Sequence, residues 1–438
     1  MSTTIIVNAR LVTLAGPDGP RRGADLRDLG VIERGWIRID GETITALGPG
    51  EYEPTEDDAD LTGELIDASG SVIMPAWVDC HTHACWAGRR FDEFEAQLAG
   101  ASYLDILQAG GGIMSTVRSV RDAPEDVLLE DLGRRLGRMH ALGTGTVEVK
   151  SGYGLQTEAE LRMLRVIHEA AQVAPQLIVG TFLGAHAKDP GNRDFVDETV
   201  TETLPAVISE FPGITVDAYC EQGAWSLEEC RRLFEAAADA GCPIRVHADQ
   251  FNPLGMTRLA IEMGAVSVDH LEASTPEELT MLAESSSFGV MLPASGFHLD
   301  DRYGPGRAFI DAGGALAIAT NYNPGSAPSP SMPFTIALAC RKLKLTPAEA
   351  ITCATWNGAC VLGLQNRVGS LEPGKRADLQ MLDAEDEREV AVEFANPGPL
   401  MVMLGGRLVH LRGIVESSED AGDHDHDHDQ DHDVDMDP

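Results

Sequence analysis

The sequence predicts an α/β protein that combines a (β/α)8 TIM-type barrel with a small β-sandwich domain built from both chain ends. Between residues 75 and 370, eight short apolar strand candidates alternate with helical patterns. Residues 1–74 and 371–413 read instead as short strands separated by Gly, Pro and Asp turns. Polar residues follow several of the eight middle strands, and the C-terminal ends of barrel strands carry the chemistry in this architecture.

Composition restricts the partners and the compartment. The 438 residues carry a net charge of −37, which argues against nucleic acid because phosphate binding needs clustered Lys and Arg. No apolar run approaches the ~18 residues of a membrane helix, and the start of the chain lacks a signal-peptide pattern. We therefore expect a cytoplasmic protein without membrane contact. The eight cysteines form no Cys-x-x-Cys pair and are expected to be free, buried thiols.

The two chain ends supply the β domain, and a tail follows it. The strand candidates are Thr4–Val7, Leu11–Leu14, Gly35–Ile39 and Thr43–Leu47 near the start, and Ala377–Leu382 and Leu400–Leu404 near the end. Residues 414–438 alternate Asp and His, for example at His424, His426, His428 and His432. Such a segment cannot form a core, so we expect a disordered, solvated tail without a catalytic role.

The middle of the chain repeats strand and helix. The strands are predicted at Trp77–His83, Thr144–Lys150, Leu177–His186, Thr215–Glu221, Ile244–Gln250, Val266–Glu272, Gly289–Pro293 and Leu316–Asn321. Between them lie helical patterns such as Leu128, Leu132 and Leu136, whose spacing makes one apolar face. Eight such units predict a closed barrel over residues 75–370.

Four histidines stand at predicted strand ends. His81 and His83 are two residues apart, a spacing that points both side chains to one face of a strand. His247 and His270 end the fifth and sixth strands. A single histidine of this kind is usually a packed or surface residue, but four that converge on one barrel mouth predict a site for a borderline metal such as zinc or iron.

Several motifs resemble one known group of enzymes. His-x-His on the first strand with histidines on the fifth and sixth is similar to the amidohydrolase superfamily. Within that superfamily the chain closely resembles the imidazolonepropionase family, the hydrolases of histidine degradation, nearly throughout residues 1–413. The pieces that match this family include Phe91–Phe94, Gly110–Ile113, Val147–Leu155, Phe182–His186 and Asn323–Ser326, and Gly369–Leu379 is similar to the superfamily's return to the β domain.

The resemblance implies a reaction and a metal centre. The family opens the ring of 4-imidazolone-5-propanoate with water and releases N-formimidoyl-L-glutamate. By the resemblance, His81, His83 and His247 are ligands of one zinc or iron ion per subunit, and the strand-eight position of Asn321 completes the set. His270 is implied to polarise the scissile carbonyl or move protons, and Gln250 to contact the ring.

The resemblance also implies how the small-molecule substrate is held. The substrate carries a carboxylate, and Arg90 matches the family's clamp arginine, whose planar guanidinium suits two-pronged binding. Without the resemblance Arg90 would pass for a surface arginine. The other matched positions are substrate contacts at Tyr153 and His186 and product contacts at Asn323, Gly325 and Ser326. Many family members are homodimers, so we expect a homodimer.

Four further residues invite a functional interpretation that we set aside. Lys150 ends the second strand, whereas the carboxylated lysine of two-metal relatives belongs to the fourth, so we interpret it as structural. His140 and His168 lie in predicted helices, and His298 lies in a predicted loop. None of the three is a ligand candidate.

Asn321 departs from the family pattern, which has an Asp there as a metal ligand and proton acceptor. An amide oxygen carries no charge and cannot act as a base at neutral pH. Asp249 and Asp269 are the candidates to replace it, although neither matches the family's base. Three hypotheses follow: an imidazolonepropionase with a modified metal site, a related amidohydrolase that acts on another small cyclic amide or amidine, or a non-catalytic relative that binds a ligand.

Overall fold

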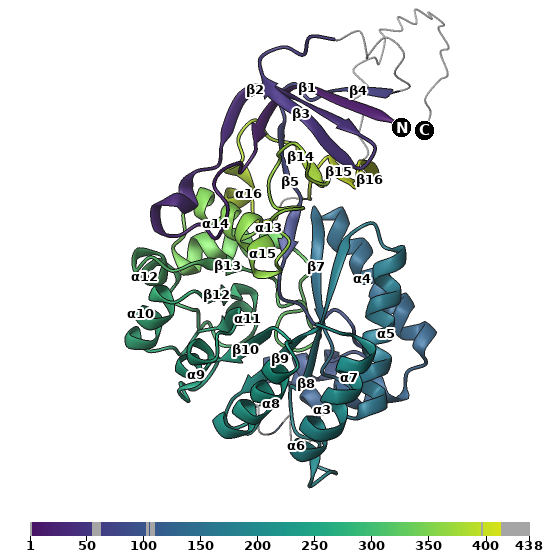
Figure 1. Cartoon of the computed structure of the whole chain (residues 1–438), viewed down its shortest axis with the longest axis vertical. Helices are drawn as coiled ribbons and strands as arrows, with labels where there is room; N and C mark the ends of the chain where they lie inside the picture. The colour runs from purple at the N-terminus through teal and green to yellow at the C-terminus, as the bar shows by residue number, and fades with distance from the viewer. Residues whose placement is uncertain (1, 55–62, 102–104, 106–109, 396, 413–438) are drawn as a thin grey trace, which may run out of the picture.

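The computed structural model describes residues 2–54, 63–101, 105, 110–395 and 397–412, which form a barrel and a separate β-sheet. Figure 1 shows the sheet above the barrel, with purple strands from the start of the chain near yellow-green strands from its end. This arrangement confirms the predicted combination of a (β/α)8 barrel with a β domain built from both chain ends. The predicted tail, residues 414–438, lies outside the described residues.

The barrel sheet contains eight parallel strands in chain order. They are β6 (Trp77–Asp79), β7 (Thr144–Lys150), β8 (Leu177–Ala185), β9 (Thr215–Cys220), β10 (Ile244–Ala248), β11 (Ser267–His270), β12 (Phe288–Met291) and β13 (Leu316–Ile318). All eight predicted strands are present, but most were predicted to extend too far at their C-terminal ends. Asp249, His270 and Asn321 have φ angles of 56°, 88° and 54°. Backbone in this left-handed region cannot continue a strand, so the chain turns into the barrel mouth.

Hydrogen bonds at the strand ends join the first barrel strand, β6, to the segment that follows the last one, β13. The carboxylate of Asp79 accepts hydrogen bonds from the backbone and the hydroxyl of Thr320, at 3.1 and 2.6 Å. Burial raises the pKa of Asp79 to about 7, partly offset by these two bonds. The backbone N–H of Asn321 donates to the carbonyl of His81 at 3.0 Å. This closure brings Asn321 beside His81.

Helices surround the barrel and connect its strands (Figure 1). Three of them, α8, α10 and α14, begin with a capping box in which Ser226, Thr275 or Thr346 exchanges hydrogen bonds with a glutamate three residues later. The helices are α1 (Phe91–Leu98), α3 (Ile113–Asp122), α4 (Glu125–Ala141), α5 (Thr157–Val173), α6 (Phe195–Glu198), α7 (Leu204–Glu210), α8 (Leu227–Asp239), α9 (Met256–Glu262), α10 (Pro276–Glu284), α11 (Pro293–Leu299), α12 (Gly306–Asp311), α13 (Met332–Leu338), α14 (Pro347–Cys353), α15 (Trp356–Val361) and α16 (Glu389–Val392), with short 3₁₀ or π turns η1 (Gly23–Arg27), η3 (Thr199–Thr203) and η4 (Ala339–Leu343).

The second sheet joins the two ends of the chain. Its strands are β1 (Thr3–Val12), β2 (Val31–Asp40), β3 (Thr43–Pro49), β4 (Gly63–Asp67), β5 (Val72–Pro75), β14 (Leu379–Leu382), β15 (Met401–Leu404) and β16 (Arg407–Leu411). The order is β16-β15-β14-β5-β1-β2-β3, and β4 pairs with β1. Antiparallel pairing of β14 with β5 links the ends, and β5 leads through Ala76 directly into the first barrel strand. The first two predicted strands are in fact one continuous strand, β1.

Three further expectations are settled by the described residues. All eight cysteines are free thiols, and most of them are buried, as predicted. No helix among these residues has both the length and the apolar character that crossing a membrane requires. His298 lies in α11 and not in a loop, because Pro293 supplies a favourable first helical residue.

Candidate metal centre and substrate site

Three histidines meet at the C-terminal mouth of the barrel. His81 and His83 follow β6, and His247 lies on β10. One ring nitrogen of each lies within 4.8 Å of those of the other two, and all three side chains are buried. The Nε2 atoms of His83 and His247 are 3.3 Å apart. His81 and His83 were predicted to lie on the first strand, but that strand ends at Asp79, and the two rings converge from the segment that follows it.

Two buried carboxylates orient the rings of His81 and His247. Nδ1 of His81 lies 2.6 Å from Asp269, and Nδ1 of His247 lies 3.1 Å from Asp217. An imidazole that donates its Nδ1–H to a carboxylate presents an unprotonated Nε2 on its other side. Nε2 of His81 is buried and has no hydrogen-bond partner among the described residues. Burial also lowers the pKa of His81 and His83 well below the usual range, so both rings are neutral.

A charged network lies beneath the histidines. Arg245 donates to Asp269 at 2.7 Å and to Glu148 at 3.0 Å. Lys150 donates to the same Glu148 at 2.7 Å and to Asp217 at 2.8 Å. These five side chains are at most 2% exposed. Each carboxylate that orients a histidine is therefore held by a cation, as buried charges require. Lys150 gives its ammonium group to two carboxylates, in keeping with the structural role predicted for it.

Asn321 lies next to the same site, because its backbone N–H bonds to the carbonyl of His81. Its Nδ2 donates to Oγ of Ser295 at 2.7 Å, and its buried Oδ1 has no partner within the described part of the chain. The oxygen is available as a metal ligand but cannot accept a proton at neutral pH. Asp249 does not replace the missing carboxylate, because it accepts hydrogen bonds from Thr257 and Ser274 at 2.7 Å each. Asp269 is likewise engaged, with His81.

His270 and Gln250 stand next to the three histidines. The His270 ring lies 5.4 Å from that of His247, centre to centre, and its Nδ1 lies 3.1 Å from Glu272. Nε2 of His270 is therefore the nitrogen left for chemistry. The carbonyl oxygen of the Gln250 side chain accepts a hydrogen bond from the Tyr219 hydroxyl at 2.8 Å. This bond leaves the amide NH₂ of Gln250 available as a hydrogen-bond donor.

His186 and Tyr153 line the opposite side of the site. The His186 ring stacks on that of His83, with centres 4.9 Å apart, and its Nδ1 lies 3.1 Å from the carbonyl of Gly152. Burial lowers the pKa of His186 to about 3, so the ring is neutral. The Tyr153 ring lies 5.2 Å from His186, and burial raises the pKa of its hydroxyl, which stays protonated. Both side chains are hydrogen-bonding groups without charge.

Arg90 is placed at the rim of the site. It precedes α1, and its Nε and Nη2 both donate to Glu93, at 2.8 and 2.6 Å. Its guanidinium lies so close to Gly325 that any side chain at that position would collide with it. Nη1 of Arg90 therefore lies against the loop that follows β13. Arg90 and Gly325, which are far apart in sequence, lie together in the folded chain.

Asn323 shapes that loop from within. Its Oδ1 accepts the backbone N–H groups of Gly325 and Ser326 at 2.8 and 2.7 Å. Its Nδ2 donates to the carbonyl of Asn321 at 2.6 Å and to Oγ of Ser326 at 2.8 Å. Asn323 was predicted as a product contact. Its side chain forms hydrogen bonds within the loop and thereby fixes the position of Gly325 and Ser326.

The donor set fits a zinc or iron ion. Two nitrogen ligands at about 2.05 Å in a tetrahedral site are roughly 3.3 Å apart, which is the separation of Nε2 of His83 from Nε2 of His247. Three imidazoles and one amide oxygen are ligands that such borderline metals accept. Buried Nε2 of His81 and Oδ1 of Asn321, both without partners in the described residues, complete the set.

Comparisons with known proteins agree with this architecture. The model of the amidohydrolase family matches residues 72–409. The chain is 45% identical over 412 residues to the imidazolonepropionase of Herpetosiphon aurantiacus, covering 91% of this chain and 95% of that protein. It is 39% identical over 413 residues to the imidazolonepropionase of Geobacillus thermodenitrificans, covering 93% and 97%. The chain belongs to the imidazolonepropionase family of amidohydrolases.

Solved structures similar to this chain share its fold. A triazine hydrolase variant superposes with a TM-score of 0.74 at 18% identity, covering 93% of this chain and 95% of that one. A 5-methylcytosine deaminase from Klebsiella pneumoniae, liganded with 5-fluorocytosine, has a TM-score of 0.70 at 16% identity and covers 94% and 98%. At these identities the likeness is one of architecture, a barrel joined to a sheet from both chain ends.

The sequence analysis missed several residues that support this imidazolonepropionase-type site. Glu148, Asp217 and Arg245 lie inside strands whose other residues are mostly apolar. Barrel strands are buried on both faces, so a charged residue inside one must have a partner. That signal was present in the sequence. Tyr219, which holds Gln250, and Glu93, which holds Arg90, gave no comparable signal, because their partners are defined only by the folded chain.

Proposed function

We propose that this member of the imidazolonepropionase family hydrolyses 4-imidazolone-5-propanoate to N-formimidoyl-L-glutamate with one zinc or iron ion per subunit. The observation that carries the proposal is the convergence of His81, His83 and His247 beside the unpartnered oxygen of Asn321. The family relationship selects the substrate. A metal held there would supply Lewis acidity and lower the pKa of water toward neutrality.

The chain's own residues orient the substrate. Arg90 holds the propionate with the side of its guanidinium that Glu93 leaves free. Gln250 donates its amide NH₂ to the ring, and Tyr153 and His186 offer neutral hydrogen-bonding groups on the other side. The loop held by Asn323 presents Gly325 and Ser326 to the opened product. Together these contacts place the ring amide next to the three histidines.

His270 handles the proton in this proposal. The oxygen of a water bonds to the ring carbonyl carbon, the ring C–N bond breaks, and the departing nitrogen takes up a proton. Asn321 cannot accept the proton that the water releases, because an amide is not a base at neutral pH. Nε2 of His270 lies on the side away from Glu272 and is placed to accept that proton and to return it to the nitrogen.

The decisive experiment is a direct assay of the purified full-length chain. We expect 4-imidazolone-5-propanoate to disappear with formation of a product heavier by one water, as followed by mass spectrometry. The matched control is the propanamide of the same ring, which lacks the carboxylate. Losing a charge-assisted pair with Arg90 costs about 1.5–3 kcal/mol, so kcat/KM should fall roughly 10- to 150-fold. Absence of turnover with metal bound would refute the proposal.

Two finer proposals concern the setting of the enzyme. We propose a cytoplasmic protein, in keeping with free thiols throughout, and a homodimer, which rests on the family resemblance. The net charge of −37 supports an enzyme without nucleic-acid partners. Light scattering coupled to gel filtration tests the dimer, and a single-subunit mass would refute it.

A further inference from the structure

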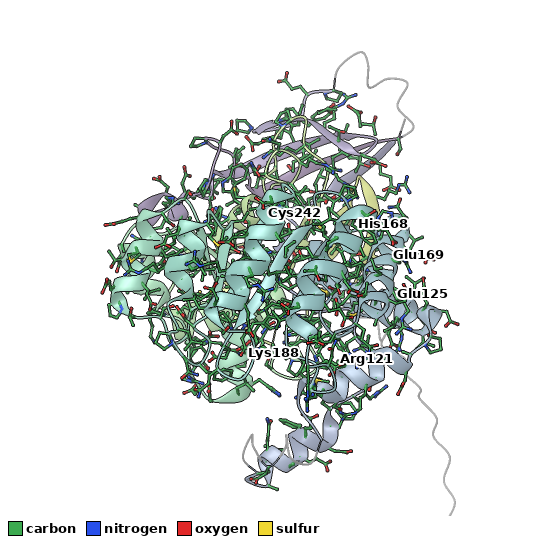
Figure 2. All side chains as sticks on the ribbon, turned by 60° about the horizontal axis from the view of Figure 1, so that its bottom comes forward. Arg121, Glu125, His168, Glu169, Lys188 and Cys242 are labelled. Atoms are coloured by element: carbon green, nitrogen blue, oxygen red, sulfur yellow. The ribbon has the colours of Figure 1, made fainter. Side chains whose placement is uncertain are left out.

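A cavity of 510 Å³ lies beside the substrate site, between the segment that follows β6, helices α1 and α4, and the loop that follows β13. Figure 2 shows a helical segment that projects from one end of the barrel. Arg121 and Lys188 are labelled near that end. Five of the residues that line the cavity are arginines: Arg89, Arg90, Arg134, Arg135 and Arg138. Only two carboxylates line it, and they leave a formal surplus of three positive charges in a chain whose net charge is −37.

The two carboxylates are already paired. Glu93 is bonded to Arg90, and Asp131 forms ion pairs with Arg134 and, at 3.6 Å, with Arg135. The guanidinium of Arg135 also lies 3.4 Å from the centre of the Trp86 ring and donates to two backbone carbonyls. It is therefore a fixed, buried part of the wall.

Two exposed arginines remain available to a ligand. Within the described residues Arg138 has no ion-pair partner, and Arg89 contacts only the ring face of Phe91, at 5.4 Å. A guanidinium on an aromatic ring keeps its N–H edges free to bind an anion. The cavity thus offers unpaired cations at its surface and paired cations in its wall.

The cavity connects with the proposed clamp. Arg90 and Gly325 line it and also belong to the substrate site. The Tyr153 ring lies 6.0 Å from that of His83, and its hydroxyl is influenced by the positive charges of Arg90 and Arg135, which oppose the effect of burial on its pKa. The exposed Arg89 and Arg138 and the half-buried Arg90 therefore line one cavity.

We infer that this arginine cavity is a collecting site for small carboxylates, in which the anionic end of the substrate is held before Arg90 binds it. Concave positive regions with low-dielectric walls focus the field and raise the local concentration of anions. Such a site counteracts the repulsion that a strongly acidic protein exerts on an anionic substrate. The inference rests on the proposed function for its substrate, but the binding of carboxylates at this place is testable without turnover.

The test compares two double variants of the full-length metal-loaded enzyme. Arg89→Gln with Arg138→Gln removes the unpaired cavity cations, whereas Arg388→Gln with Arg407→Gln removes the same charge from highly exposed positions just before α16 and on β16. One charge about 10 Å away in water changes an anion's affinity roughly twofold. We expect the cavity variant to raise KM about fourfold, with kcat unchanged and a weaker dependence of kcat/KM on salt. The control variant should match the natural protein.

A second measurement tests the binding of a carboxylate without the hydrolysis reaction. Calorimetric titration with glutarate, a small dicarboxylate, should show binding that weakens about fourfold in the cavity variant and persists in the control. Arg89→Lys with Arg138→Lys retains both charges and should restore the glutarate affinity and the KM of the natural protein. This result would show that the effect of the Gln variant comes from lost charge and not from a change in structure. Equal KM, salt dependence and glutarate affinity in the cavity variant and the natural protein would overturn the inference. If no turnover occurs at all, the proposed function fails, and the glutarate titration alone decides this inference.

Discussion

Asn321→Asp is the substitution that tests the site most directly. The present side chain donates its NH₂ to Ser295 and has a buried amide oxygen without a partner in the described residues, and its backbone N–H donates to the carbonyl of His81. An aspartate fits the same volume: one oxygen takes a hydrogen bond from the Ser295 hydroxyl, and the other occupies the place of the amide oxygen. The substitution therefore adds a negative charge and a base at the metal position without moving other atoms.

The size of the effect follows from this geometry. A positioned general base contributes about 10²–10⁴-fold in rate, so kcat of the variant should rise by up to that factor if Asn321 limits proton transfer. Metal affinity should rise at least tenfold, about 1.4 kcal/mol, because a charged ligand replaces a neutral one. Without metal the added carboxylate is buried, and a pKa raised by about two units would cost roughly 2.7 kcal/mol of stability near pH 7.5.

The assay measures metal dissociation constants by chelator competition, with kcat and thermal unfolding measured beside them. Asn321→Ala serves as the control, because it removes the oxygen without adding charge. Metal affinity should rise in the order Ala, Asn, Asp, and the metal-free Asp variant should unfold at a lower temperature than the natural protein. If the Ala and Asn forms bind metal equally well, Asn321 is no ligand. An unchanged kcat for the Asp form would show that proton transfer already depends wholly on His270.

Three further outcomes are expected. Lys150→Met leaves the buried Asp217 without its ammonium partner and Glu148 with Arg245 alone. It should weaken metal binding about 10- to 100-fold and destabilise the fold by roughly 3–5 kcal/mol, measured by chelator competition and urea unfolding; unchanged metal affinity would contradict the network. Tyr219→Phe should raise KM about fivefold with kcat retained, since one hydrogen bond to Gln250 is worth about 1 kcal/mol, whereas a selective loss of kcat would place Tyr219 in the chemistry. Burial gives His186 a pKa of about 3, so between pH 6.5 and 4.5 the unfolded chain takes up a proton that the folded chain does not. The metal-free protein should therefore lose about 2.3 kcal/mol more stability over this range than His186→Asn, and equal losses would contradict a neutral, buried His186.

The sequence predicted the barrel because its signal is repetitive. Eight apolar strands with intervening helical spacing leave few alternatives, and all eight strands are present. Strand ends were predicted less well, since a backbone turn at Asp249 or Asn321 depends on closure of the barrel and not on local propensity. The histidines were found because they recur at strand ends. The partners of Arg90 and Gln250 were not found, because Glu93 and Tyr219 become significant only when folding brings them into contact.

The buried network explains how a neutral donor set can hold a divalent cation. Three formal negative charges, on Glu148, Asp217 and Asp269, face two positive charges, on Lys150 and Arg245. The excess of one negative charge lies directly behind the histidines and favours a cation in front of them. With a divalent ion the region would carry one net positive charge, whereas an aspartate at position 321 would cancel it. The natural asparagine therefore lacks a base, but with a divalent ion bound it leaves the site positively charged for an anionic substrate. The metal affinities of the Asn321 variants measure how strongly the charge at this position affects the ion.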